Sequence, residues 1–142
     1  MENTKKNKIT VTTSVILPID KVWKLWTNPT DIINWNFASD DWQTTKAEND
    51  LRIGGKFLSR MEAKDKSFSF DFWGFYDNII TNSLIEYSLG DDRKVKIIFK
   101  EENNQTKITE TFEAETENTL ELQQIGWQAI LNNFKKYAES KY

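Results

Sequence analysis

The longest regular pattern of apolar positions lies at the C-terminal end of the chain. Side chains expected to face inward recur there at alternating spacings of four and three, which is the period of one face of an α-helix. They are Leu120, Gln124, Trp127, Leu131, Phe134 and Ala138. Asn118, with Glu121 three residues later, is typical of a capping box that begins a helix. The sequence therefore predicts one terminal helix of roughly 23 residues, about 34 Å long, with this stripe buried.

The preceding part of the chain shows the two-residue alternation of β-strands. A first strand over residues 9–17 ends at Pro18. Turn-forming residues then separate six further runs, over residues 42–48, 55–63, 67–78, 83–89, 93–101 and 106–115. Connections this short favour a meander of neighbouring antiparallel hairpins. We therefore expect a seven-stranded antiparallel sheet.

Two short helices are predicted between the first and second strands. Asp20 can cap a helix that stops at Thr27, and Asn28 before Pro29 can cap a second helix that ends at Trp35. No Gly/Ser-rich linker or change of composition divides the chain. We expect residues 1–142 to form a single α+β domain in which residues 1–7 are flexible.

Composition restricts the chemistry that the protein can perform. The chain has no Cys and no His, which excludes disulfides, thiolate or imidazole metal sites and His-based triads. We therefore expect no metal and no cofactor. The formal net charge of -3 makes nucleic acid a poor partner, and no stretch approaches the ~18 apolar residues of a membrane span. The N-terminus has no apolar signal core, so we expect a cytoplasmic protein that is a monomer or a weak dimer.

The alternation also assigns a helix-facing side to each strand. The pattern leaves open whether this side forms a solid core or lines a cavity, because both need apolar side chains that face the helix. The residues expected to line a ligand cavity are Trp35, Phe57, Met61, Phe70, Phe72, Tyr87, Ile97, Phe99, Glu110, Phe112, Gln124, Trp127 and Leu131.

Glu110 is the polar exception on this apolar side, between Ile108 and Phe112. A carboxylate is costly to bury unless it is paired or neutralised, and burial would raise its pKa and provide a proton donor or base without His. Gln124 could face Glu110 across the interior and help to orient a ligand hydroxyl or carbonyl. The alternative is a structural ion pair, or a strand edge that reaches solvent. Glu110 is thus the candidate catalytic residue.

Two glycine sites suggest local backbone roles. Gly54 and Gly55 precede a strand and favour a bend or bulge in a curved sheet. Gly126 lies inside the predicted terminal helix, where glycine costs about 1 kcal/mol relative to Ala. We expect a close approach of the helix to the sheet at Gly126 to compensate for this cost.

Several short motifs occur in an order that points to a known superfamily. They are PIDKVW at residues 18–23, Trp35, DLRIGGKF at 50–57, FDFWGFY at 70–76 and GWQAIL at 126–131. Together they resemble the START-like (SRPBCC) helix-grip superfamily, and within it the bacterial branch related to the activator of heat-shock-protein ATPase and to polyketide-cyclase-like proteins. The resemblance implies a curved antiparallel sheet that grips the C-terminal helix around a cavity for a hydrophobic molecule. It does not imply one activity.

Three functions are compatible with these observations. The first is a non-catalytic module that binds a small hydrophobic or lipid-like molecule. The second is a cyclase-like or hydratase-like enzyme, in which Glu110 with Tyr76 or Tyr87 moves protons on a polyketide-like substrate. The third, which rests on the resemblance, is a co-chaperone-type interaction protein with a chaperone as its partner.

Overall fold

The computed structural model describes residues 7–142. In chain order the elements are β1 (Lys8–Val15), α1 (Ile19–Thr27), α2 (Pro29–Trp35), β2 (Trp42–Asn49), β3 (Lys56–Ala63), β4 (Ser69–Ile80), β5 (Leu84–Leu89), β6 (Lys94–Glu102), β7 (Gln105–Glu113) and α3 (Leu120–Lys141). Of the segment predicted to be flexible, residues 1–6 lie outside the described residues. Asn7 is described, and its carbonyl accepts a hydrogen bond of 2.8 Å from the backbone N–H of Ala114.

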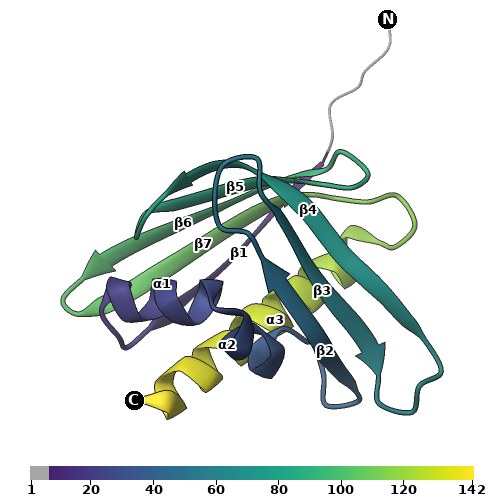
Figure 1. The fold of residues 1–142 in the computed structure, drawn as a ribbon, viewed down its shortest axis with the longest axis horizontal. Helices are drawn as coiled ribbons and strands as arrows, with labels where there is room; N and C mark the ends of the chain where they lie inside the picture. Colours follow the sequence, from purple (N-terminus) through teal and green to yellow (C-terminus); the bar gives the residue numbers. More distant parts are fainter. Residues whose placement is uncertain (1–6) are drawn as a thin grey trace, which may run out of the picture.

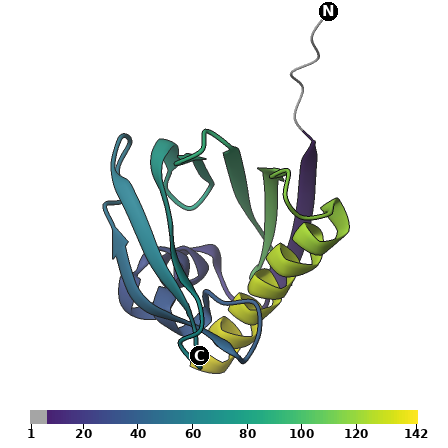
Figure 2. The same cartoon turned by 90° about the vertical axis from the view of Figure 1, so that its right-hand side faces the viewer.

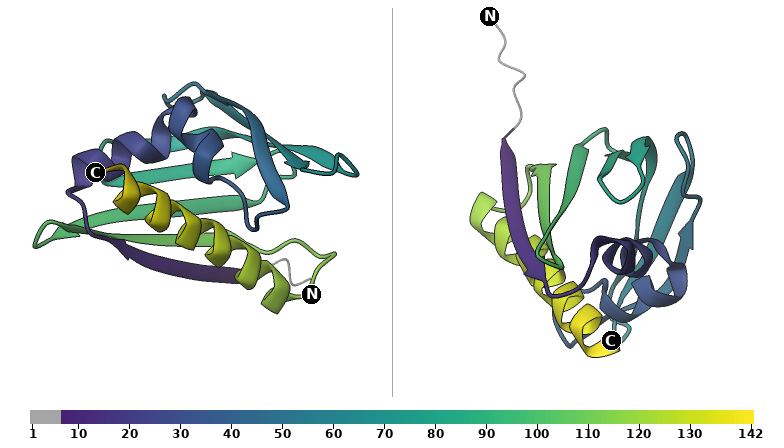
Figure 3. Two further views of the ribbon diagram at one scale, coloured as in Figure 1. Left: turned by 90° about the horizontal axis from the view of Figure 1, so that it is seen from below. Right: turned by 90° about the vertical axis from the view of Figure 1, so that its left-hand side faces the viewer.

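The strands form one antiparallel sheet in the order β1-β7-β6-β5-β4-β3-β2 (Figure 1). β2 to β7 follow one another as the predicted meander, and β1 joins the sheet beside β7. The chain therefore passes from one edge of the sheet to the other through α1 and α2. Figure 2 shows that the sheet curls into a half-barrel, and Figure 3 shows α3 between β1 and the pair α1 and α2. This arrangement confirms the predicted α+β helix-grip fold.

The buried stripe of α3 differs from the predicted one at its N-terminal end. Leu131, Phe134 and Ala138 are fully buried, as predicted, and Trp127 packs against the core. Gln124 is exposed, however, and its neighbour Gln123 is buried instead. Positions three and four residues before Trp127 both lie near the predicted face, so spacing alone does not choose between them. Leu120, the first predicted member of the stripe, is also exposed.

Two predicted helix caps are wrong. The N-cap of α3 is Thr119, whose hydroxyl accepts a hydrogen bond of 3.1 Å from the N–H of Leu122, rather than Asn118. Asp20 does not cap α1 but lies inside its first turn. The backbone N–H of Ile19 donates instead to the carboxylate of Glu101 on β6, with 2.7 Å between N and Oε1. The predicted start of α2 is confirmed, because Asn28 Oδ1 accepts from the N–H of Thr30 at 3.1 Å.

The two glycine sites have different outcomes. Gly54, with a φ of 84°, and Gly55 lie opposite one residue of β4, because the N–H of Gly54 donates to the carbonyl of Tyr76 at 2.8 Å and the N–H of Tyr76 donates to the carbonyl of Gly55 at 2.9 Å. This pairing of two residues with one, next to the start of β3, confirms the predicted bulge. A Cβ added to Gly55 would lie 2.1 Å from the carbonyl oxygen of Asp50, so this position cannot hold a larger residue without a backbone shift. A Cβ added to Gly126 would meet nothing within 4 Å. The predicted close approach of α3 to the sheet at Gly126 is therefore wrong.

Candidate functional site

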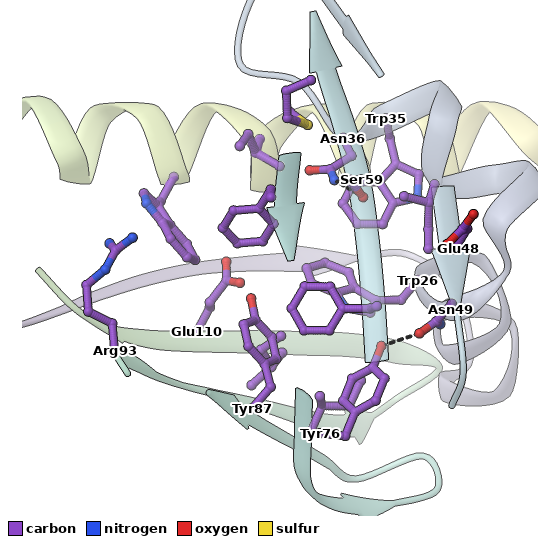
Figure 4. Close-up of a pocket in the computed structure, with 18 of the residues that line it drawn as sticks. Trp26, Trp35, Asn36, Glu48, Asn49, Ser59, Tyr76, Tyr87, Arg93 and Glu110 are labelled. Atoms are coloured by element: carbon purple, nitrogen blue, oxygen red, sulfur yellow. Dashed lines mark hydrogen bonds between the residues drawn. The ribbon is translucent and has the colours of Figure 1, made fainter. Parts of the chain in front are cut away.

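A cavity of about 330 Å³ lies between the concave side of the sheet and α3 (Figure 4). Nine of the predicted residues line it: Trp35, Phe57, Met61, Phe70, Phe72, Tyr87, Ile97, Glu110 and Trp127. They come from α2, from five of the strands and from α3. The alternation along the strands therefore located most of the wall, and the cavity occupies part of the apolar face.

Four predicted residues do not line the cavity. Gln124 is exposed, while Phe99, Phe112 and Leu131 are buried in solid core. Phe112 stacks against Trp127, with ring centroids 3.9 Å apart and an angle of 10° between the rings. It thus supports the cavity wall from behind. The apolar face contains both a packed core and a cavity, an alternative that the sequence pattern left open.

Several lining residues were not among the predicted candidates. They include Trp26, Ile32, Asn36, Glu48, Asn49, Arg93, Glu115, Gln123 and Ile130. Arg93 and Glu115 lie at the ends of the predicted strands over residues 93–101 and 106–115, but in the structure they lie just outside β6 and β7, and Asn36 follows the end of α2. Trp26 was the most accessible to prediction, because it lies in the apolar stretch of α1.

Aromatic rings form the wall of the cavity near α1 and α2. Trp26 lies 4.8 Å from Trp35 between ring centroids, and both lie 4.9 Å from Phe134. The indole N–H of Trp35 donates to the carbonyl of Leu25 at 3.1 Å, so this polar group is already satisfied. Rings that contact one another in this way have few alternative rotamers, and they keep the wall in place.

Most polar side chains around the cavity have partners within the protein. Asn49 donates to the carbonyl of Thr27 at 2.7 Å and accepts from the hydroxyl of Tyr76. Gln123 donates to the carbonyls of Glu115 at 3.1 Å and Asn118 at 2.9 Å, and its own oxygen accepts from the N–H of Glu115 at 2.9 Å. Gln123 therefore fixes the connection between β7 and α3.

The expected pairing of Glu110 with a glutamine is absent, because Gln124 is exposed and Gln123 binds the backbone.

Among the carboxyl, hydroxyl, amide and guanidinium groups of the lining, those of Glu110 and Tyr87 are the exceptions. These residues are 6% and 7% exposed, and neither the carboxyl nor the hydroxyl makes a hydrogen bond or an ion pair with a described residue. No fully enclosed side-chain oxygen of the described residues lacks a partner, so the oxygens of Glu110 and Tyr87 open onto the cavity. In Figure 4 the carboxyl group of Glu110 and the hydroxyl of Tyr87 both point into the cavity, close to each other. The structural ion pair and the solvent-exposed edge considered for Glu110 are therefore both wrong.

Burial controls the protonation of these two groups. It raises the pKa of Glu110 to about 8. Burial, followed by the charge of nearby Glu110, raises the pKa of the Tyr87 hydroxyl well above its usual value. At neutral pH Glu110 is thus mostly protonated, and the cavity presents two O–H groups that can donate or accept hydrogen bonds.

The curled sheet, the long α3 and the cavity between them define a START-like helix-grip domain. More specifically, the chain belongs to the family described as Activator of Hsp90 ATPase homolog 1-like protein, whose model matches residues 17–139. No curated protein matched the chain. None of the helices in residues 7–142 is long and apolar enough to cross a membrane.

Solved structures agree with this assignment. The solution structure of an AHSA1-like protein from Aeromonas hydrophila is 41% identical, with a TM-score of 0.89 over 95% of this chain and 94% of that chain. A protein from Cytophaga hutchinsonii is 52% identical, with a TM-score of 0.82 over 94% and 93% of the two chains. A protein from Chromobacterium violaceum, 20% identical with a TM-score of 0.83 over 94% and 97%, shares the fold.

Proposed function

We propose that this protein binds one small, mainly apolar molecule in the cavity between the sheet and α3. The observation that carries the proposal is a cavity of about 330 Å³ into which two buried polar groups point without a protein partner. Its volume equals that of about eleven water molecules, so it suits a ligand of roughly a dozen non-hydrogen atoms. Of the three functions considered from the sequence, ligand binding is the one that this cavity supports directly.

The packing around the cavity favours a pocket that persists without a ligand. Trp127 is held by its stack on Phe112, and Phe57 contacts both Tyr76 and Tyr87, with ring centroids 5.3 and 4.6 Å away. Large rings that support one another cannot easily collapse into the space between them. A preformed pocket binds with little loss of conformational entropy, because few side chains become ordered on binding.

Calorimetric titration with octan-1-ol tests the proposal, since this alcohol has an apolar chain and one hydroxyl. We expect saturable binding of one molecule per chain. Ile130→Trp places a larger side chain in the cavity and should abolish binding. Ile125→Trp is the matched control, because Ile125 lies on the same helix but is 58% exposed, and it should bind as the parent does.

Two results would contradict the proposal. One is that the folded parent protein binds none of octan-1-ol, octylamine and octanoate. The other is that Ile130→Trp, shown to be folded by its thermal transition, binds octan-1-ol as tightly as Ile125→Trp does.

A further inference from the structure

The charged groups of the cavity lining are partnered, with one exception. At one end Glu48 pairs with Lys46, with Nζ and Oε2 2.9 Å apart. At the other end Arg93 pairs with Asp91 at 2.8 Å, and Glu115 accepts hydrogen bonds from Asn118. Of the charged side chains on the described lining, Glu110 is the one without an opposite charge or a hydrogen-bond donor. What the cavity lacks is therefore a positive charge beside Glu110.

Aromatic rings line the cavity that Glu110 faces, while its cross-strand neighbours are Val11 on β1 and Ile97 on β6. Trp127 and Phe72 line the same cavity with ring centroids 6.0 Å apart, and the ring of Tyr87 lies next to the carboxyl group in Figure 4. Aromatic rings attract ammonium groups through their quadrupole, and this attraction is stronger away from water. A carboxyl group among aromatic rings is a combination that suits an organic cation with an apolar body.

We propose that the ligand is an apolar amine, whose ammonium group lies beside Glu110 and Tyr87 and whose apolar part extends among the aromatic rings toward Trp26 and Trp35. This inference rests on the proposed function and specifies its ligand class. The ammonium group donates hydrogen bonds to the Glu110 carboxylate and to the oxygen of Tyr87. An apolar carboxylate would instead add a negative charge next to a buried acid, and an apolar alcohol would gain a hydrogen bond but no charge pairing.

Binding of such a ligand is coupled to a proton. The amine enters as ammonium, the Glu110 carboxyl group loses its proton to solvent, and the complex contains the ammonium and carboxylate pair. Because burial raises the pKa of Glu110 to about 8, about one proton is released per ligand bound at pH 7. The affinity for the amine should therefore rise with pH until Glu110 is ionised in the free protein.

The other groups that share the cavity with Glu110 keep their charge over this range. Burial raises the pKa of Tyr87 on β5, and the hydrogen bonds from Asn118 lower the pKa of Glu115 after β7. Arg93 before β6 pairs with Asp91 at 2.8 Å, and, against the opposing effect of partial burial, its hydrogen bonds lower the pKa of Asp91. On the side of α3 the cavity is lined by Gln123, Trp127 and Ile130, none of which titrates.

The test compares octylamine, octan-1-ol and octanoate by calorimetric titration at pH 6, 7 and 8. For a group with a pKa of about 8, octylamine should bind about 50-fold more tightly at pH 8 than at pH 6. Octan-1-ol should lose at most about twofold over the same range, because it binds the protonated form. At pH 8 the order of affinity should be octylamine, then octan-1-ol, then octanoate.

A variant separates Glu110 from the general charge of the protein. Glu110→Gln keeps the size of the side chain but cannot ionise, so it should lose both the preference for octylamine over octan-1-ol and the pH dependence of octylamine binding. Glu102→Gln also removes one carboxylate, but Glu102 is exposed at the end of β6 and outside the cavity. This control should keep the preference for octylamine and its pH dependence.

The outcomes separate this inference from the proposed function. If octan-1-ol binds the parent at pH 8 as tightly as octylamine, the amine is wrong as the ligand class while the binding function stands. If none of the three compounds binds, the binding function itself fails. If Glu110→Gln does not fold, the parent protein still tests the inference. Octylamine titrations of the parent in two buffers of different ionisation enthalpy should then show that a proton is released on binding. No release would overturn the inference.

Discussion

At the scale of single residues, Glu110 occupies a position that disfavours its ionised form. It is buried on β7 between Val11 and Ile97 of the neighbouring strands, and no described residue offers it a hydrogen bond or an opposite charge. Loss of hydration therefore dominates, and it raises the pKa of Glu110 to about 8. A group of this kind makes the stability of the folded protein depend on pH in a direction that can be predicted.

We expect Glu110→Gln to stabilise the protein at high pH. With a pKa near 4.5 in the unfolded chain and about 8 in the folded protein, the unfavourable effect of Glu110 is absent below about pH 4.5 and grows up to about pH 8. Gln has no charge to bury, so the variant should exceed the parent in free energy of unfolding by about 4 kcal/mol at pH 8 and by less than about 1 kcal/mol at pH 5.

Urea unfolding of both proteins at the two pH values measures this difference. A variant that is less stable than the parent at pH 8 would mean that Glu110 is stabilised by a partner in the folded protein.

Glu110 also indicates how far sequence can predict single residues. Its burial followed from two-residue alternation, because Ile108 and Phe112 share its side of β7. The corresponding prediction for α3 was wrong, because Gln124 is exposed and Gln123 is buried. A strand has two sides, and one apolar neighbour fixes the direction of the next. A helix has 3.6 residues per turn, so two adjacent positions can lie equally near one face. Contacts outside the helix then determine which of the two is buried.

At the scale of elements, the helix ends depend on groups that are distant in the sequence. Glu101 on β6 satisfies the first free N–H of α1, more than eighty residues earlier in the chain. Local capping rules correctly located the start of α2, where the cap is Asn28 itself. They failed for α1, because no short-range sequence signal identifies a cap that another strand supplies.

Gly126 weakens α3 without any packing reason that the structure shows. A Cβ at this position meets nothing within 4 Å, so Gly126→Ala should fit without strain. Alanine is favoured over glycine inside a helix, and we expect a gain of about 1 kcal/mol in the free energy of unfolding. Thermal and urea unfolding measure the gain.

Gly55→Ala provides the contrast, because its Cβ would lie 2.1 Å from the carbonyl of Asp50 and should destabilise the protein. A loss of stability in Gly126→Ala would show that the glycine serves a role in packing or ligand entry.

At the scale of the whole molecule, order and spacing were enough to predict the architecture. Seven alternating runs, two short helices and one long amphipathic helix correspond to β1 to β7, α1, α2 and α3. The cavity was less accessible to sequence reasoning. Whether Phe99 and Leu131 fill a core or border a space depends on how far the sheet curls away from α3, and alternation does not report curvature. The loop residues Arg93 and Glu115 come together only in the folded chain.

The fold as a whole depends on α3. Its residues Leu131, Phe134 and Ala138 are fully buried. The ring of Phe134 packs edge-on against those of Trp26 and Trp35, with ring centroids 4.9 Å apart in both pairs. Full burial of a Leu or Phe side chain contributes about 1.5–3 kcal/mol, and domains of this size are stable by only about 5–15 kcal/mol. A chain that ends at Asn118 should therefore show no cooperative thermal transition by circular dichroism. The control is a chain that ends at Ser140, which keeps the whole buried stripe and should melt near the parent temperature. A cooperative transition in the chain that ends at Asn118 would contradict a fold that depends on its last helix.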